Sequence, residues 1–250
     1  SLKSTAELEA PVQSFFTKDP QWVNYVTAVT YPNFKYGQLV FNTVWVGVWS
    51  TVGTLITTIL AAFAFARIRF KGSTMLFSLF MATMMIPGEM MVITNFITIM
   101  EWGMYNTYSA MIIPFWVSTY YIFLLRNTFK QIPNELYYAA KVDGTSDFKY
   151  LLKVMLPIAS PTIITITILK LMGAWNSYIW PNLVTDASLG KDLTLITVGL
   201  RKAFAADDGL LPQTNLQMAA TTVVTVPLLL VFIFFRKYII KGVSRSGIKG

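Results

Sequence analysis

Long apolar segments alternate with short charged segments along this chain of 250 residues. A helix needs about 20 apolar residues to cross the hydrocarbon core of a bilayer, so an uncharged run of that length is typical of a membrane span. The chain has five such segments, at residues 39–66, 73–100, 108–125, 158–180 and 216–235. The pattern therefore predicts an all-α fold, a polytopic transmembrane helix bundle with five spans within residues 38–240.

Three features interrupt this pattern. Pro87 and Gly88 stand inside the second segment, and proline and glycine inside a helix predict a kink or a break. Glu89 follows them directly, and Lys170 lies inside the fourth segment. Residues 1–37 are mixed in polarity and contain three prolines, which favours an ordered surface segment over a long helix.

Basic residues are distributed unequally between the two sides of the predicted membrane. One side has thirteen Lys and Arg and three acidic residues, whereas the other has six basic and eight acidic residues. Because cytoplasmic loops hold the excess of positive charge, residues 127–157 and the tail 241–250 are predicted to be cytoplasmic and residues 1–37 extracytoplasmic. No signal peptide precedes the first span, so we expect a sixth span before residue 1.

Composition narrows the classes of function. The chain is 54% hydrophobic and 13% charged, whereas soluble domains carry about 25% charged residues. It has neither cysteine nor histidine, which excludes disulfides, Ser-His-Asp catalysis and the usual zinc and haem sites. The acidic residues are scattered, so no metal site is expected. The net charge of +8 comes from bases that flank the spans, not from a basic face for nucleic acid.

The cytoplasmic connection at 127–157 is too regular for a simple tether. Pro133 suits the start of a helix over 134–142, and Gly144 suits the left-handed backbone that often follows a helix end. A second helix, capped by a Ser-Asp pair, is predicted to begin near Phe148 and to run into the next proline. The sequence thus predicts a helix, a sharp turn and a helix at the membrane surface.

Part of this loop resembles a known family. The pattern E-L-x-x-A-A-x-x-D-G, followed after nine residues by aliphatic-x-L-P, resembles the EAA loop of binding-protein-dependent ABC importer permeases. In that family the first short helix inserts into a cleft on the ATP-binding subunit. The resemblance implies docking by Glu135, Leu136, Tyr138, Ala139, Ala140, Asp143 and Gly144. Tyr138 stands where the family has its glutamate, so Glu135 is expected to replace that carboxylate.

Further motifs extend the resemblance over most of the chain. FARIRFKG at 65–72, WNSYIWP at 175–181 and NLQMAA at 215–220 occur in the same order in carbohydrate permeases similar to the maltose-type G subunit. The resemblance implies a non-catalytic permease of the bacterial or archaeal cytoplasmic membrane without a cofactor of its own. Its implied partners are a second homologous permease, an ATP-binding subunit dimer that holds ATP and Mg, an extracytoplasmic solute-binding protein and a saccharide.

Polar residues inside the spans are candidates for the translocation path, because a polar group in the hydrocarbon region usually faces the bundle or water. Asparagine bonds sugar hydroxyls, and aromatic rings stack on sugar faces. We select Glu89, Asn95, Trp175, Asn176 and Tyr178. The alternative for these residues is helix packing or an interfacial position. For Lys170 the alternatives are snorkelling to the surface and pairing with a partner chain.

Two other functions share part of this pattern. An ABC permease for a solute that is not a sugar would share the docking loop and differ only in the path. A secondary transporter would need coupling-ion sites and inverted repeats. The sequence shows no internal duplication and only two ionisable residues within the spans, so the importer permease is favoured.

Overall fold

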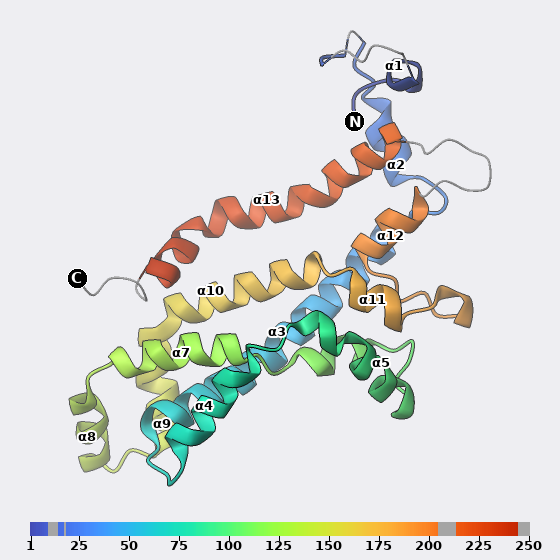
Figure 1. The fold of residues 1–250 in the computed structure, drawn as a ribbon. Coiled ribbons are helices and arrows are strands. Elements are labelled where there is room, and N and C mark those ends of the chain that lie inside the picture. Colours follow the sequence, from blue (N-terminus) through green and yellow to red (C-terminus); the bar gives the residue numbers. More distant parts are fainter. Residues whose placement is uncertain (10–14, 18, 205–213, 245–250) are drawn as a thin grey trace.

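The computed structural model describes residues 1–9, 15–17, 19–204 and 214–244. Every regular element within these residues is a helix (Figure 1). This confirms the predicted all-α bundle. Residues 245–250 of the predicted cytoplasmic tail lie outside the described residues.

Three helices are long and apolar enough to cross a membrane within the described part of the chain. They are Tyr36–Arg67, Asp147–Trp175 and Thr214–Arg236. The first is α3 (Tyr36–Arg67), the second ends as α10 (Leu156–Trp175), and the third lies in α13 (Thr214–Ser244). Helix α10 packs against both α3 and α13.

Two further segments pass the same test only as bent pairs. Helix α4 (Ser73–Thr83) meets η1 (Gly88–Met91) and α5 (Val92–Glu101) at 87°. Helices α6 (Tyr108–Ile112) and η2 (Ile113–Phe115) meet α7 (Thr119–Gln131) at 44°. If each pair is one span, the described residues contain five spans, as the apolar pattern predicted. The break at Pro87 and Gly88 was predicted as well.

The third apolar segment differs from the span predicted at 108–125, because it contains a bend. The chain leaves the helical path before α7, where the Ser118 Oγ accepts the Tyr121 backbone N–H at 3.5 Å and caps a new helix. Pro114, near the start of η2, has no N–H to donate. Helix α7 then continues to Gln131, beyond the predicted end at Leu125.

The fourth segment also ends earlier than the predicted residue 180. Helix α10 stops at Trp175, and a separate helix, α11 (Ile179–Val184), follows. The turn between them lets the indole of Trp180, which is buried, donate through Nε1 to the carbonyl of Ala110 at 3.0 Å. Burying this ring against α6 changes the direction of the chain.

The remaining helices are short. They are α1 (Thr5–Glu9), α2 (Val23–Val29), α8 (Asn134–Val142), α9 (Asp147–Tyr150), the π turn η3 (Leu151–Met155), η4 (Ala187–Leu189) and α12 (Ile196–Ala203). Figure 1 shows α8 and α9 at the end of the bundle where α3 finishes, and α2 and α12 at the opposite end. The 127–157 loop is therefore remote from the N-terminal segment.

Described residues of the N-terminal segment pack against other helices. Ala28 and Phe34 are fully or almost fully buried in one hydrophobic cluster with Phe204 of the α12 end and Ala219 of α13. The Phe34 and Phe204 rings lie 5.5 Å apart between centroids. Apolar contacts thus join α2 and the residues after it to the end of α13.

Two glycines of α3 offer a matched test of this packing. A Cβ at Gly53 would lie 2.1 Å from the Trp116 ring, whereas a Cβ at Gly47 would lie 3.6 Å from the Cβ of Ala174. Alanine otherwise stabilises a helix interior by about 0.5–1 kcal/mol relative to glycine. We expect Gly47→Ala to raise the thermal unfolding midpoint of the purified protein and Gly53→Ala to lower it. Equal midpoints for the two variants would contradict this packing at the α6–α7 break.

Candidate functional site

The 127–157 loop begins with the predicted short helix. Helix α8 runs from Asn134 to Val142, with Pro133 in the capping position at φ −55° and ψ 140°. Proline lacks an N–H and has its φ fixed near the helical value, so it starts a helix without leaving an unpaired donor. The predicted bounds of this helix are confirmed.

The turn after α8 depends on Gly144. Its φ is +70°, in the left-handed region that glycine adopts without steric cost. The Gly144 N–H donates to the Lys141 carbonyl at 3.1 Å, and the Thr145 N–H donates to the Ala140 carbonyl at 2.9 Å. These two bonds form a Schellman motif, which satisfies carbonyls that a helix end leaves unpaired. The predicted glycine turn is confirmed.

The second short helix is continuous with a membrane-spanning helix. Helix α9 starts at Asp147, and the Ser146 Oγ accepts the Lys149 backbone N–H at 3.3 Å. The chain then passes through η3 into α10 without a break and remains helical to Trp175. The helix therefore does not stop at Pro157, as the sequence had suggested. The π turn η3 comes directly before this proline, and a π turn or a proline can bend a helix without ending it.

Side chains join the two short helices across the turn. The Tyr137 hydroxyl donates to Asp147 Oδ1 at 2.8 Å, and Lys141 Nζ forms an ion pair with the same oxygen at 2.8 Å. The Tyr137 ring also packs edge-on against the buried Tyr150, with 5.1 Å between centroids. Helix α8 is thereby held at a defined angle to α9.

The charges in this cluster are stable near neutral pH. The hydrogen bond from Lys141 and then that from Tyr137 lower the pKa of Asp147, and the bond to Asp147 raises the pKa of Lys141. A depressed carboxyl pKa stabilises the loop above the pKa of the unfolded carboxyl and loses this effect as the pH falls through the folded value. The raised pKa of Lys141 means that its contribution is lost only as the pH rises through that value. The contact persists between these limits.

An exposed apolar patch surrounds the turn. Val142 is 87% exposed and Phe148 is 61% exposed, on either side of Gly144, and Leu136 and Tyr138 are exposed on α8. Large apolar side chains gathered on a surface mark interaction sites. Val142 and Phe148 are additions to the residues that the sequence motif had selected. Their signal in the sequence was an apolar residue on each side of a polar turn.

The other predicted docking residues divide into two groups. Glu135, Ala139, Asp143 and Gly144 are exposed. Ala140 is half-buried and packs against the hydrophobic cluster that contains Phe129 and Tyr150. Of the two alanines, Ala139 is therefore available to a partner, and Ala140 fits α8 to the bundle.

Arg67 ties the base of α8 to the end of α3. The Arg67 side chain is buried, and its Nη2 donates to the carbonyls of Phe129 at 2.9 Å and of Ile132 at 2.5 Å. Its Nη1 donates to Oδ1 of Asn134, the first residue of α8. A planar guanidinium suits such a fork of acceptors. Sequence reasoning treated this arginine only as the charged end of a span.

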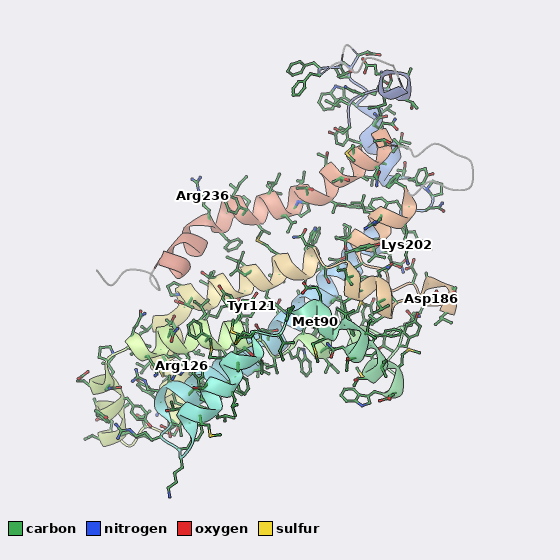
Figure 2. All side chains as sticks on the ribbon, in the orientation of Figure 1. Met90, Tyr121, Arg126, Asp186, Lys202 and Arg236 are labelled. Atoms are coloured by element: carbon green, nitrogen blue, oxygen red, sulfur yellow. The ribbon has the colours of Figure 1, made fainter. Side chains whose placement is uncertain are left out.

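A second basic side chain approaches the same helix. Arg69 Nη2 donates to the Tyr138 hydroxyl at 3.5 Å, so the residue that replaces the family's glutamate contacts the connection between α3 and α4. Nearby, the guanidinium of Arg126 lies 3.7 Å from the ring centroid of Phe77, and Figure 2 shows Arg126 where α7 approaches α4. Arginines of the α3–α4 connection and of α7 thus lie beside this loop.

The path candidates at the end of α10 make contacts within the bundle. Trp175 Nε1 donates to the Val224 carbonyl of α13 at 3.2 Å. Asn176 Nδ2 donates back to its own helix, to the Met172 carbonyl at 2.9 Å. The Tyr178 ring is half-buried, with the guanidinium carbon of Arg201 4.9 Å from its centroid. These contacts match the helix-packing alternative for Trp175.

Glu89 and Asn95 lie on the bent second segment, in η1 and α5, and both are exposed. Among the described residues, no hydrogen bond or ion pair joins either of them to Trp175, Asn176 or Tyr178. The structure therefore does not gather the five path candidates into one site within this chain.

A cavity of about 410 Å³ lies on another side of α10, where the sequence singled out only Lys170. Residues at the break between η2 and α7 line it, and Tyr121 of α7, labelled in Figure 2, lies beside α10 there. Both hydroxyl groups and aromatic rings line this cavity. The lining includes Ser50, Phe115, Ser118, Tyr120, Tyr121, Lys170, Ser177 and Trp180.

Comparison with known proteins places this geometry in a family. Residues 38–245 match the family described as binding-protein-dependent transport system inner membrane component. The chain is 30% identical over 212 residues to an arabinooligosaccharide transport permease of Halalkalibacterium halodurans, which covers 84% of this chain and 73% of that protein. It is 29% identical to an sn-glycerol-3-phosphate transport permease of Rhizobium meliloti, with the same coverage of 84% and 73%.

A solved structure shares the fold. A chain of a bacterial ABC transporter, described as involved in the import of the acidic polysaccharide alginate, matches with a TM-score of 0.78. The two chains are 24% identical, and the match covers 95% of this chain and 86% of the other. Together with the match over residues 38–245, this shows that the chain belongs to the family of binding-protein-dependent transport system inner membrane components.

Proposed function

We propose that this chain is the pore-forming permease subunit of an ATP-driven importer that moves a saccharide across the cytoplasmic membrane. One observation carries the coupling part of this proposal. Helix α8 ends in a glycine turn that presents the exposed Val142 and Phe148, and the next helix continues directly into the span α10. Because the helix is continuous, a partner that binds the turn and changes its position would also move the membrane-spanning α10.

The proposed partner at this patch is an ATP-binding subunit, which holds ATP and Mg. Its cleft would receive Leu136, Tyr138 and Val142 of α8, with Glu135 and the basic Arg69 at the edge. A motor shifts a conformational equilibrium only through different contacts in the two states. A helix fixed by a Schellman turn and by the Asp147 contacts transmits such a difference.

Further partners complete the transport path. A second homologous permease would cover the exposed apolar side chains at the bend from α4 through η1 to α5, where Met85, Met90 and Ile93 are each at least 72% exposed. An extracytoplasmic solute-binding protein would deliver the solute at the end of the bundle opposite α8. In this orientation the C-terminus would lie in the cytoplasm. Lipid would cover the remaining apolar surface.

The saccharide class rests on the arabinooligosaccharide permease among the relatives and on the carbohydrate-type motifs of the sequence. The cavity beside α10 combines hydroxyl groups with the rings of Phe115 and Trp180, which suits the hydroxyls and apolar faces of a sugar. A small phosphorylated polyol is the second candidate solute, because another relative is an sn-glycerol-3-phosphate permease.

The test is ATP hydrolysis by the complex reconstituted from this chain, its partner permease, the ATPase and the binding protein. We expect saccharide-loaded binding protein to stimulate hydrolysis above the rate with the empty binding protein. Stimulation by sn-glycerol-3-phosphate and not by saccharides would favour the second candidate. A chain that purifies without an ATPase, and whose membranes show no ATP-dependent uptake, would contradict both.

A further inference from the structure

Lys170 is an ionisable residue in the apolar helix α10, close to the Trp175 end. A charged side chain at membrane depth is costly, so it usually faces a water-filled cavity, a charge partner or a transported ion. Lys170 is half-buried and lines the cavity of about 410 Å³ between α3, the η2–α7 break, α10 and α11. Its position needs an explanation that helix packing does not supply.

The nearest contacts of the ammonium group are dipoles. Lys170 Nζ donates to the Phe115 carbonyl at 3.0 Å and lies 5.6 Å from the centroid of the Phe115 ring. Within the described residues, the ion pairs are Lys35 with Asp192 and Lys141 with Asp147. No carboxylate in that part of the chain therefore balances the charge of Lys170.

Lys170 is not required to satisfy the broken third span. The Phe115 carbonyl already accepts the Thr54 hydroxyl of α3 at 2.8 Å. The next carbonyl, that of Trp116, accepts the Thr57 hydroxyl at 2.5 Å. Two threonines of α3 thus pair these two carbonyls at the break, and a neutral residue at position 170 would leave neither unpaired.

The break itself adds to the positive potential of the cavity. Ser118, which caps α7, and Tyr120 and Tyr121 of its first turn line the same space as Lys170. The N-terminus of a helix carries a partial positive charge. Discontinuous spans in transporters direct such ends at anionic groups of the solute. A full positive charge and a helix N-terminus thus border one cavity.

We propose that this cavity receives an anionic group of the transported solute, a carboxylate or a phosphate, and that the Lys170 ammonium binds it. The hydroxyls of Ser50 and Ser177 and the ring of Trp180 line the space that the rest of the solute would occupy. This inference rests on the proposed transport function and names the substrate class within it: acidic saccharides or phosphorylated polyols, in preference to neutral sugars.

The test is uptake into proteoliposomes that contain the complete transporter and its binding protein. The probes are matched sets of glucose, glucuronate and glucose 6-phosphate, their oligosaccharide counterparts, and glycerol with sn-glycerol-3-phosphate. We expect the wild type to take up the acidic member of each set faster than the neutral member. Whether the carboxylate or the phosphate probe is taken up faster shows which anionic group the cavity binds. Lys170→Gln should lower uptake of the acidic member about tenfold, the scale of one charge-assisted hydrogen bond, and change uptake of the neutral member less than twofold.

Two controls separate binding from general charge effects. Lys170→Arg keeps the charge and should retain the preference for the acidic member. Lys191→Met removes an exposed positive charge that lies outside the cavity, and it should leave the ratio of acidic to neutral uptake unchanged. A loss of preference in Lys191→Met equal to that in Lys170→Gln would overturn the proposal.

A second variant tests the cavity if Lys170→Gln does not assemble. Ser50→Asp places a carboxylate in the same cavity, so it should compete for Lys170 and lower acidic uptake, whereas Ser50→Asn should not. Unchanged uptake of the acidic probes by both Ser50→Asp and Lys170→Gln would overturn the proposal. The proposal would also be overturned if the complex fails to assemble with Lys170→Gln and assembles with Lys170→Arg. That result would assign Lys170 to an ion pair with the partner subunit. A wild type that transports none of the probes would instead count against the proposed function.

Discussion

Valine in place of Gly144 is expected to abolish coupled transport while the chain remains in the membrane. The left-handed backbone at φ +70° costs an L-residue roughly 1–2 kcal/mol, and a β-branched side chain adds to that cost. A Cβ at Gly144 meets no atom within 4 Å, so the effect arises from the backbone and not from a clash. Relief of the strain would break the two Schellman bonds and turn α8 away from α9. Copurification of the ATPase and solute uptake in cells are the measurements.

Two controls isolate the position of the turn. Gly144→Asn should retain at least half of the uptake, because asparagine tolerates the left-handed region. Gly190→Val introduces the same strain at φ +78° in a loop away from α8, again with no atom within 4 Å of the new Cβ. It should leave ATPase association intact. Normal uptake by Gly144→Val would refute the proposed docking role of this loop.

Loss of the Arg67 guanidinium is expected to give the largest loss of stability. Arg67→Met removes hydrogen bonds to the carbonyls of Phe129 and Ile132 and to Asn134, and it leaves buried acceptors with fewer partners. Hydrogen bonds from charged groups contribute about 1.5–3 kcal/mol each, so we expect a loss of roughly 3 kcal/mol or more. Because α8 is no longer tied to α3, ATP hydrolysis should also lose its dependence on the loaded binding protein. Thermal unfolding and ATPase assays of the complex measure the two effects.

Arg69→Met is the matched control, because it removes the same charge two residues away. Arg69 has an exposed side chain and a single long hydrogen bond to Tyr138, and weak surface contacts contribute little. Its unfolding midpoint should stay near that of the wild type. Arg67→Lys, which keeps the charge but not the fork, should fall between the two. An Arg67→Met protein as stable as Arg69→Met would rule out the anchoring role.

Local signals in the sequence were sufficient for the 127–157 loop. Proline before a helix, glycine after it and serine as a cap each act within a few residues, and the structure places α8, the turn at Gly144 and the cap at Ser146 as predicted. The adjacent Pro87 and Gly88 likewise predicted the bend in the second segment. These features depend on the backbone freedom of single residues.

The bend before α7 was not predicted, although Pro114 stands near it. A proline within an apolar run is compatible with a kinked helix and with a complete break. The choice depends on whether other groups pair the freed carbonyls. Thr54 and Thr57 of α3 do so here, from about sixty residues away in the sequence. Only the packing of α3 against this segment settles the outcome.

By itself, the sequence determined the class of fold, the approximate limits of the spans and the turn at Gly144, because apolar length and backbone preference are local properties. The tertiary structure decided which face each polar side chain occupies. Trp175 points at α13 and Lys170 lines a cavity, although both lie on α10. The rotation of a helix about its axis depends on all its neighbours together. That is why Arg67 and Lys170 acquired their places only in the folded chain.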